Sequence, residues 1–329
     1  MATIGTDLPN MSDLMKGLDP DGAVATVVEA LTKRNPVLED MVVKEGNLTT
    51  GHRVTTRVGL PSVGWRRYNE GVAISKGKKG QYDEACGQLE GMSAVDVKLA
   101  RLGGNEAAFR ASEDMAFVQS MNNELSTGVF YHSTKTAPEK FMGLSPRLDS
   151  TTGPWGGQIV FSTAGANGND NASLWLVCWG PESVYGIYPK GTQGGLVPDD
   201  LGKQLWDDGS GKKYRAWVTH WSWDFGLVVQ DARQLVRIGN IDLGQIAANT
   251  DELVDAAISA YYRIFDPQIG RLVFYTNRTV ATYLHKQAKN ATKNSTLSIE
   301  TVAGRPITSL LGIPIHVTDA LGSTEAVLS

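Results

Sequence analysis

The sequence predicts an α+β fold, and three observations favour that class. Some stretches carry apolar residues at helical spacing, and others are short runs rich in β-branched and aromatic residues. These two kinds of stretch do not alternate regularly, as they do in proteins built from βαβ units. The chain has 329 residues, of which 41% are apolar and 20% charged, a composition typical of a folded protein with a sizeable core.

The first part of the chain, residues 1–45, is predicted to be an arm. Residues 1–22 are polar and show no period, which is typical of a segment that needs a partner to become ordered. A short helix is expected next, because Asp21 can cap it and Asn35-Pro36 ends it. Its apolar stripe consists of Val24, Val27, Val28 and Leu31.

Residues 46–85 are predicted to form an extended loop that contains a long β-hairpin. Residues 54–58 favour a strand, the turn-forming residues 59–62 interrupt it, and Trp65 to Tyr68 resume the strand pattern. A hairpin with few core-forming residues is only marginally stable alone in water. We therefore expect it to lie against another surface.

The charge of this hairpin is one-sided. Between Gly51 and Gly80 seven Lys or Arg residues accompany a single acid, Glu70, whereas residues 1–50 hold eight acids and four bases. A solvated basic face is the simplest interpretation, and ion pairs with acids of a neighbouring subunit are the alternative. The candidate contact residues are Arg53, Arg57, Trp65, Arg66 and Arg67.

The strongest helix signal in the chain covers residues 105–127, within the region 86–145. Asn105 can cap this helix and Gly128 can end it, and at about 1.5 Å per residue it forms a rod of roughly 34 Å. Apolar residues occur on more than one of its faces, so the helix should be buried on more than one side. The residues expected in its core are Met115, Val118 and Leu125.

The rest of the chain is predicted to be rich in strands. Residues 143–173 are rich in Gly, Ser, Thr and Asn and should form a loop. One helix is expected from the cap Asn249 to Asp266, and another after the cap Asn277. A closing strand is expected within residues 312–321. Further strands are expected at residues 174–179, 183–188, 214–221, 226–230, 235–241 and 272–275.

No pattern in the sequence specifies catalysis, a cofactor or a metal site. The glycine-rich phosphate-binding patterns are missing, and the five His residues never form a close pair. The most enzyme-like stretch holds His220, Ser222 and Asp224, which would share one face of a strand. Ser222 lacks the Gly-x-Ser-x-Gly context of a hydrolase nucleophile, so tryptophans filling a sheet face explain this stretch more simply. Cys86 and Cys178 are expected to be reduced, structural thiols.

Composition also limits the partners. The formal net charge of −4 argues against a protein whose whole surface binds nucleic acid. No stretch approaches the ~18 apolar residues that span a bilayer, and residues 1–10 lack the pattern of a signal peptide. We therefore expect a protein that is made in the cytosol and has no membrane partner.

Four stretches are typical of one viral protein family. They are Asn35-Pro36-Val37-Leu38 before the hairpin, Glu84-Ala85-Cys86-Gly87 before the long helix, the strand and helix start at residues 272–278, and Leu311-Gly312-Ile313-Pro314-Ile315 with Asp319. With the order of the predicted elements, these stretches resemble the major capsid protein fold of tailed bacteriophages, the Hong Kong 97 type. The resemblance covers most of the chain and is strongest to coat proteins of short-tailed phages of the epsilon-fifteen kind.

The resemblance implies a division of the chain into named parts. Residues 1–45 would be the N-terminal arm and residues 46–85 the extended loop. Residues 86–145 would be the peripheral domain, in which the helix at 105–127 is the spine helix. Residues 146–270 would form mainly the axial domain, and residues 271–329 would be strands and a helix shared by the axial and peripheral domains.

The resemblance also implies a function without catalysis. The subunit would form hexamers and pentamers of an icosahedral shell around double-stranded DNA, which it would contact non-specifically. A separate scaffolding protein and a portal would be its partners, with a decoration protein as an optional third. The subunit would be assembled in the host cytoplasm into the virion capsid. An encapsulin-like nanocompartment shell is the alternative, and a hydrolase centred on His220, Ser222 and Asp224 is a distant third.

Overall fold

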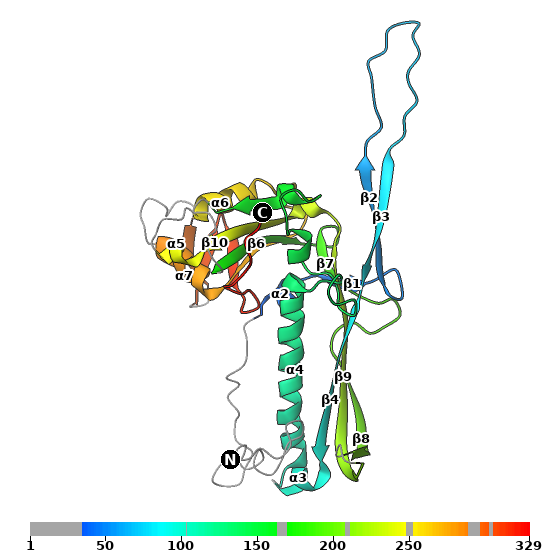
Figure 1. Cartoon of the computed structure of the whole chain (residues 1–329), viewed down its shortest axis with the longest axis vertical. Coiled ribbons are helices and arrows are strands. Elements are labelled where there is room, and N and C mark those ends of the chain that lie inside the picture. Colours follow the sequence, from blue (N-terminus) through cyan, green and yellow to red (C-terminus); the bar gives the residue numbers. More distant parts are fainter. Residues whose placement is uncertain are drawn as a thin grey trace.

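The computed structural model describes residues 35–102, 104–162, 170–207, 211–247, 253–288, 297–302 and 305–329. Figure 1 shows a sheet-rich body, a β-hairpin that projects from one side of it, and a long helix with adjacent strands that projects from the opposite side. The predicted arm helix that Asp21 would cap lies outside the described residues.

Helices and strands are mixed along the chain without regular alternation, which confirms the α+β class. The α-helices are α2 (Val37–Asp40), α3 (Val97–Leu102), α4 (Glu106–Tyr131), α5 (Leu243–Ala247), α6 (Leu253–Tyr261) and α7 (Arg278–Ala288). The strands are β1 (Val43–Glu45), β2 (Gly51–Gly59), β3 (Lys78–Ala85), β4 (Gly87–Asp96), β5 (Ile159–Phe161), β6 (Asn171–Trp179), β7 (Val184–Tyr188), β8 (Val197–Asp207), β9 (Lys213–Val229), β10 (Leu235–Asp242), β11 (Arg271–Thr276), β12 (Leu297–Val302), β13 (Arg305–Leu310) and β14 (Ile313–Val317). Short 3-10 helices lie at Ser145–Arg147, Gly156–Gln158 and Ala232–Gln234.

The body is built around β6, in which every residue is buried. Its continuous apolar run favours a strand that is covered on both faces. β6 pairs in antiparallel fashion with β10 on one edge and β11 on the other. Because side chains alternate along a strand, Leu174 and Leu176 join a core with α6 and α7, while Trp175 and Val177 join a core with the end of α4.

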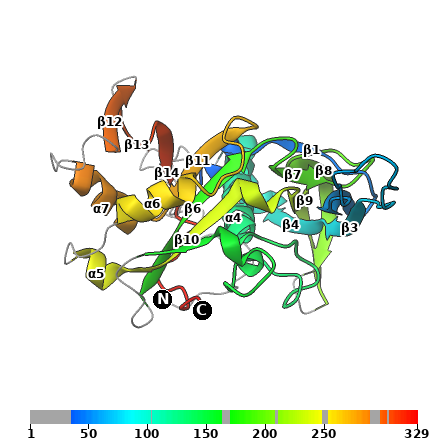
Figure 2. The same cartoon turned by 90° about the horizontal axis from the view of Figure 1, so that it is seen from above.

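Strand β9 connects the body with the part that projects beside α4. Its residues 226–229 pair with β7 in the body, and its residues 216–225 pair with β4. β8 pairs along the outer part of β9. Figure 2 shows β12 and β13 at one end of the molecule and β4, β8 and β9 at the other. The range 146–270 therefore contributes strands both to the body and to the part that projects beside α4.

Two strand predictions differ from the structure, and several strands, among them β4, β8, β12, β13 and β5 in the expected loop, were not predicted. The two strands expected at 214–221 and 226–230 are the single strand β9, because the residues between them continue to pair with β4. Trp65 to Tyr68 form no strand and lie between β2 and β3. β8 was not predicted, since its Asp, Gly and Lys residues disfavour strands. Its pairing with β9 stabilises it instead.

The two later helix predictions have different outcomes. The predicted cap of α7 is confirmed, because Asn277 Oδ1 accepts a hydrogen bond from Val280 N at 2.9 Å. Helix α6 ends at Tyr261, earlier than expected, because the residues after it form tight turns in which Arg263 N donates to Ala260 O. Its predicted cap, Asn249, lies outside the described residues.

Helix α4 begins where the sequence predicts and ends later. Asn105 Oδ1 accepts a hydrogen bond from Ala108 N at 3.1 Å, which confirms the cap. The helix continues through Gly128 to Tyr131. A Cβ at position 128 would stand 2.4 Å from His132 Nδ1, so the glycine serves close packing here and does not end the helix.

The expectation that α4 is buried on several sides is wrong for the single subunit. Leu125 is 2% exposed, but Val118 is only half-buried and Met115 is 59% exposed. The reason is the position of the helix: only its C-terminal end lies in the body, and the rest projects beside β4 and β9 (Figure 1).

This difference predicts opposite outcomes for two substitutions on one helix. Leu125→Asp should lower the free energy of unfolding by several kcal/mol, a large part of a typical ~5–15 kcal/mol, because it buries a carboxylate without a partner. Met115→Asp should change it by only about 0.5 kcal/mol, because that side chain faces solvent. Denaturant titrations of the two purified variants measure both changes in the free energy of unfolding. Equal losses would show that the uncovered face of α4 belongs to the subunit core.

Candidate assembly surfaces

The base of the β2–β3 hairpin is fastened to the body. Arg147 and Glu84 form a salt bridge in which both side chains are buried, and Arg147 Nη2 donates to Glu84 Oε2 at 2.8 Å. The same guanidinium donates to Leu227 O in β9 at 3.3 Å. Tyr82 Oη donates to Val229 O at 2.7 Å. These bonds hold β3 against β9, so the direction in which the hairpin projects is fixed.

The far end of the hairpin, which we call the tip (residues 60–77), touches little of its own subunit. It ends in a turn in which Glu70 N donates to Arg67 O at 3.3 Å and Asn69 has a φ of 69°. Trp65 is fully exposed, at 107%. The other large apolar side chains exposed on the tip are Leu60, Val63, Tyr68, Val72 and Ile74. Exposed apolar side chains gathered in this way mark a surface that binds another protein.

The five predicted contact residues fall into two groups. Arg53 forms a two-bond ion pair with Asp83 across the hairpin, with both N–O distances at 2.7 Å. The hairpin thus carries an acid, Asp83, that lies just beyond the basic range 51–80 and neutralises one of its arginines. Arg57 is exposed and lies opposite Lys79 in the β2–β3 register.

Arg66 and Arg67 directly follow Trp65 at the tip, and both are exposed. Within the described part of the chain, neither has an ion pair. The tip therefore presents an indole and two cations without an ion pair at three consecutive positions, whereas Arg53 and Arg57 lie in β2. The apolar tip residues around Trp65 were not predicted as contact residues, although an apolar residue in an otherwise polar hairpin is a signal for such a surface.

A second cluster fastens the start of the described chain to the sheet. Asp40, at the end of α2, has a side chain that is 3% exposed. Its carboxylate accepts a hydrogen bond from Tyr275 Oη at 2.6 Å, contacts His316 Nδ1 at 2.6 Å and pairs with Arg271 at 2.9 Å. Burial acts to raise the pKa of Asp40, but the bonds from His316 and Tyr275 and the charges of His316 and Arg271 outweigh burial and lower this pKa below its ordinary 3.8.

The lowered pKa predicts how Asp40 affects stability in acid. A carboxyl group with a depressed pKa in the folded state contributes stability that is complete above its unfolded pKa of about 3.9 and is lost as the pH falls through the folded value. Asp40→Asn lacks this contribution. The free energy of unfolding of the variant should therefore fall less steeply than that of the parent below about pH 4. Denaturant titrations at a series of pH values test this, and parallel curves would show that Asp40 does not titrate differently on folding.

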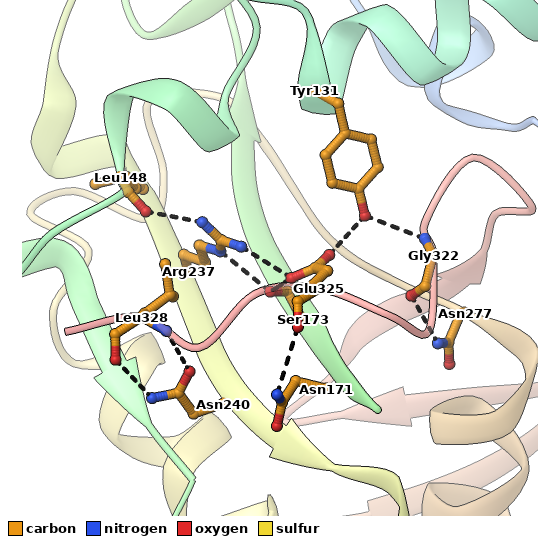
Figure 3. A network of polar contacts seen from close by, with 10 residues as sticks. All are labelled: Tyr131, Leu148, Asn171, Ser173, Arg237, Asn240, Asn277, Gly322, Glu325 and Leu328. Atoms are coloured by element: carbon orange, nitrogen blue, oxygen red, sulfur yellow. Dashed lines mark hydrogen bonds and ion pairs between the residues drawn. The ribbon is translucent and has the colours of Figure 1, made fainter. Parts of the chain in front are cut away.

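A third cluster fastens the end of the chain, residues 322–329, which we call the C-terminal strap (Figure 3). Glu325 Oε2 accepts a hydrogen bond from Arg237 Nη2 at 2.8 Å, and the two side chains are 8% and 4% exposed. Ser173 also donates to Glu325, and Tyr131 Oη donates to its Oε1 at 2.5 Å. One carboxylate therefore joins β6, β10 and the last residue of α4.

Further bonds hold both ends of the strap. Asn240 and Leu328 exchange two hydrogen bonds of 2.9 and 2.8 Å, and Thr151 N donates to Ser329 O at 3.0 Å. Gly322 N donates to Tyr131 Oη at 3.1 Å. The strap thus crosses the junction between α4 and the sheet, and it fixes the direction of α4 relative to the body.

The most enzyme-like stretch lies within β9 and has structural partners. His220 Nε2 lies 3.4 Å from Glu90 of β4, and Asp224 pairs in register with Gln88. Among the described residues, no group of His, Cys, Asp and Glu side chains could hold a metal ion. Both cysteines are free thiols, and burial raises the pKa of Cys86 to about 12. None of the described helices is long and apolar enough to cross a membrane.

Comparison with known families shows to which family a chain with this projecting hairpin and long helix belongs. The model of the family "Major capsid protein GP7" matches residues 19–329. The chain belongs to this family of major capsid proteins. No curated protein sequence matches it significantly.

A solved structure extends the assignment to the fold. The chain is similar to a chain of bacteriophage epsilon15, solved by cryo-EM, with 34% identity and a TM-score of 0.78 over 100% of this chain and 99% of that chain. The resemblance stated from the sequence is therefore confirmed: the fold is that of the Hong Kong 97-type capsid proteins, and the chain is a major capsid protein of a tailed phage.

More distant structures share this similarity at low identity. The SrpI encapsulin of Synechococcus elongatus PCC 7942 is 12% identical, with a TM-score of 0.46 over 71% of this chain and 96% of that chain. The Microbacterium phage Oxtober96 structure is 10% identical, with a TM-score of 0.46 over 71% and 99% of the two chains. Neither supports an argument on function. The family model and the epsilon15 structure favour a phage capsid protein over the encapsulin alternative.

Proposed function

We propose that this capsid protein forms hexamers and pentamers of an icosahedral shell around double-stranded DNA, and that the hairpin tip of each subunit lies across a neighbouring subunit. One observation carries the proposal: the apolar tip residues, led by Trp65, are exposed on a hairpin whose base is fixed. Fully burying one large apolar side chain stabilises a contact by about 1.5–3 kcal/mol. A closed shell repeats that contact at every subunit.

The same proposal assigns the parts of the chain and the partners. Residues 1–45 act as the arm, 46–85 as the extended loop, 86–145 as the peripheral domain, 146–270 mainly as the axial domain, and 271–329 as strands and a helix shared by both domains. A separate scaffolding protein and a portal are its partners, with a decoration protein as an optional third, and the particle is assembled in the host cytoplasm. DNA is held non-specifically, in keeping with a net charge of −4. Catalysis has no part in this function.

The assembly is tested by expressing the chain with and without a scaffolding protein and purifying the product. Size-exclusion chromatography and negative-stain electron microscopy should show pentamers, hexamers or shells. A compact monomer under all conditions would rule out a shell-forming subunit. Co-purified double-stranded DNA supports the phage function, whereas a co-purified protein cargo would favour a nanocompartment.

A further inference from the structure

The C-terminal strap lies on the body in the way that a bound peptide lies on its receptor (Figure 3). Residues 322–324, 326, 327 and 329 of the strap are exposed. Two of its side chains, Glu325 and Leu328, pack into the subunit, three positions apart. Proteins hold extended peptides with the same elements, because main-chain hydrogen bonds give affinity and pockets for a few side chains give specificity.

The first anchor, Glu325, enters a carboxylate site that other parts of the chain build. Three donors meet there, namely Arg237 of β10, Ser173 of β6 and Tyr131 of α4. Arg237 has bonds that do not involve the strap, because its Nη1 donates to Leu148 O at 2.9 Å and its Nε to Ser173 Oγ at 3.1 Å. Its side chain is 4% exposed. A buried guanidinium held in this way favours a ligand that brings a carboxylate.

The second anchor, Leu328, is held through its backbone and its side chain. Leu328 N donates to Asn240 Oδ1 at 2.8 Å, and Asn240 Nδ2 donates to Leu328 O at 2.9 Å. One side-chain amide thus satisfies both backbone groups of the bound residue. A Cβ at Gly239 would stand 2.4 Å from Leu328 Cδ1, so the glycine leaves the space that the leucine fills.

The other bonds of the strap use its backbone. Glu325 N donates to Asn171 O at 2.9 Å, beyond the end of the pairing between β6 and β11. Gly322 N and Ser329 O bond in the same way to Tyr131 and to Thr151 N. Backbone bonds do not depend on sequence, so the Glu and Leu anchors decide which peptide fits the groove. An exposed segment held at a few points opens locally more easily than the whole subunit unfolds.

We propose that the groove under the strap is a binding site for a peptide with Glu at one position and Leu three positions later, and that subunits exchange their straps through it. The strap of a second copy makes the same contacts as the subunit's own, as in domain swapping. Neighbouring copies in a shell present their straps at a high effective concentration. The exchange between copies rests on the proposed shell, whereas the peptide site does not.

Peptide binding to the full chain tests the site. Glu325→Gln with Leu328→Ala weakens the chain's own strap, and the probe is a fluorescein-labelled peptide of residues 322–329. Fluorescence anisotropy should show saturable binding. Binding should be weaker by about tenfold or more for probe peptides with Glu325→Ala or Leu328→Ala, and weaker for the parent chain, whose own strap competes. No saturable binding, or equal binding of the three peptides, would overturn the site.

Native-state hydrogen exchange of the parent chain keeps the proposal testable if the weakened variant does not fold. The amides of Glu325 and Leu328 should exchange by local opening, at rates that low concentrations of denaturant leave unchanged. The amides of β6 are the reference, because they should exchange faster as denaturant promotes global unfolding. If the two strap amides follow the β6 amides in this dependence, the strap opens only with the whole subunit and is not an exchangeable ligand.

Mixed particles test the second copy. p-Benzoylphenylalanine replaces Val327, which is 51% exposed, and particles assembled from isotope-labelled and unlabelled subunits are irradiated. Mass spectrometry should find mixed-label crosslinks between position 327 and peptides that contain Asn240 or Thr151. Crosslinks in which both peptides always carry the same label would contradict strap exchange. The peptide and hydrogen-exchange measurements use soluble subunits, so a failure of the shell and a failure of this site give different results.

Discussion

Replacing Glu325 by alanine is expected to lower the free energy of unfolding by about 3–5 kcal/mol, the cost of removing one partner from a buried ion pair. The reason is the position of Arg237, whose side chain is 4% exposed. Without Glu325 its charge stays buried, with hydrogen bonds from the guanidinium to Ser173 Oγ and Leu148 O but no counter-charge in the strap. A loss of this size is a large share of a typical ~5–15 kcal/mol.

Denaturant titration of the soluble subunit measures this loss. Glu325→Gln is the first control, because it keeps the side-chain size while removing the charge, and it should lose less than Glu325→Ala. Asp83→Ala is the second control. It removes the two-bond partner of Arg53, but both side chains of that pair are 50% exposed, so solvent screens the charges and the midpoint should stay close to that of the parent. Equal midpoints for Glu325→Ala and Asp83→Ala would show that the strap does not stabilise the subunit.

The strap illustrates what the sequence did not predict. Glu325 and Arg237 are 88 positions apart, and Asp40 and His316 are 276 apart. A charge pair leaves a local signal only when its members share a helix face or neighbouring strand positions. Elements with such signals were predicted well. The cap at Asn277 and the apolar run of β6 each depend on residues that are adjacent in the chain.

Helix α4 shows a different limit. Its apolar period correctly predicted a long helix, but a period tells which residues share a face and not which molecule covers that face. Met115 is exposed in the subunit for this reason. The same limit applies to the candidate site: the sequence indicated that the hairpin needs another surface, and only the structure shows that its tip is uncovered.

Reversing both tip arginines, Arg66→Glu with Arg67→Glu, is expected to leave the subunit folded and to abolish most particle assembly. The fold should persist because both side chains are exposed and neither has an ion pair within the described residues. Assembly should fail because charge-assisted bonds contribute about 1.5–3 kcal/mol where shielded, and the reversal replaces attraction by repulsion at every repeated contact.

Trp65→Ser tests the apolar half of the same contact. An aromatic anchor at the centre of an interface typically contributes roughly 2–4 kcal/mol, so particle yield should fall while the thermal melt of the subunit stays unchanged.

Lys98→Glu with Lys135→Glu is the matched control for the arginine reversal, because it makes the same change in net charge at two exposed positions away from the tip. Circular dichroism and thermal melts report the fold, and negative-stain counts report the particles. If the arginine reversal unfolds the isolated subunit, the tip belongs to the core of its own chain. If it assembles as well as the lysine control, the two arginines make no contact between subunits, because a repulsive charge pair repeated around a closed shell cannot leave the yield unchanged.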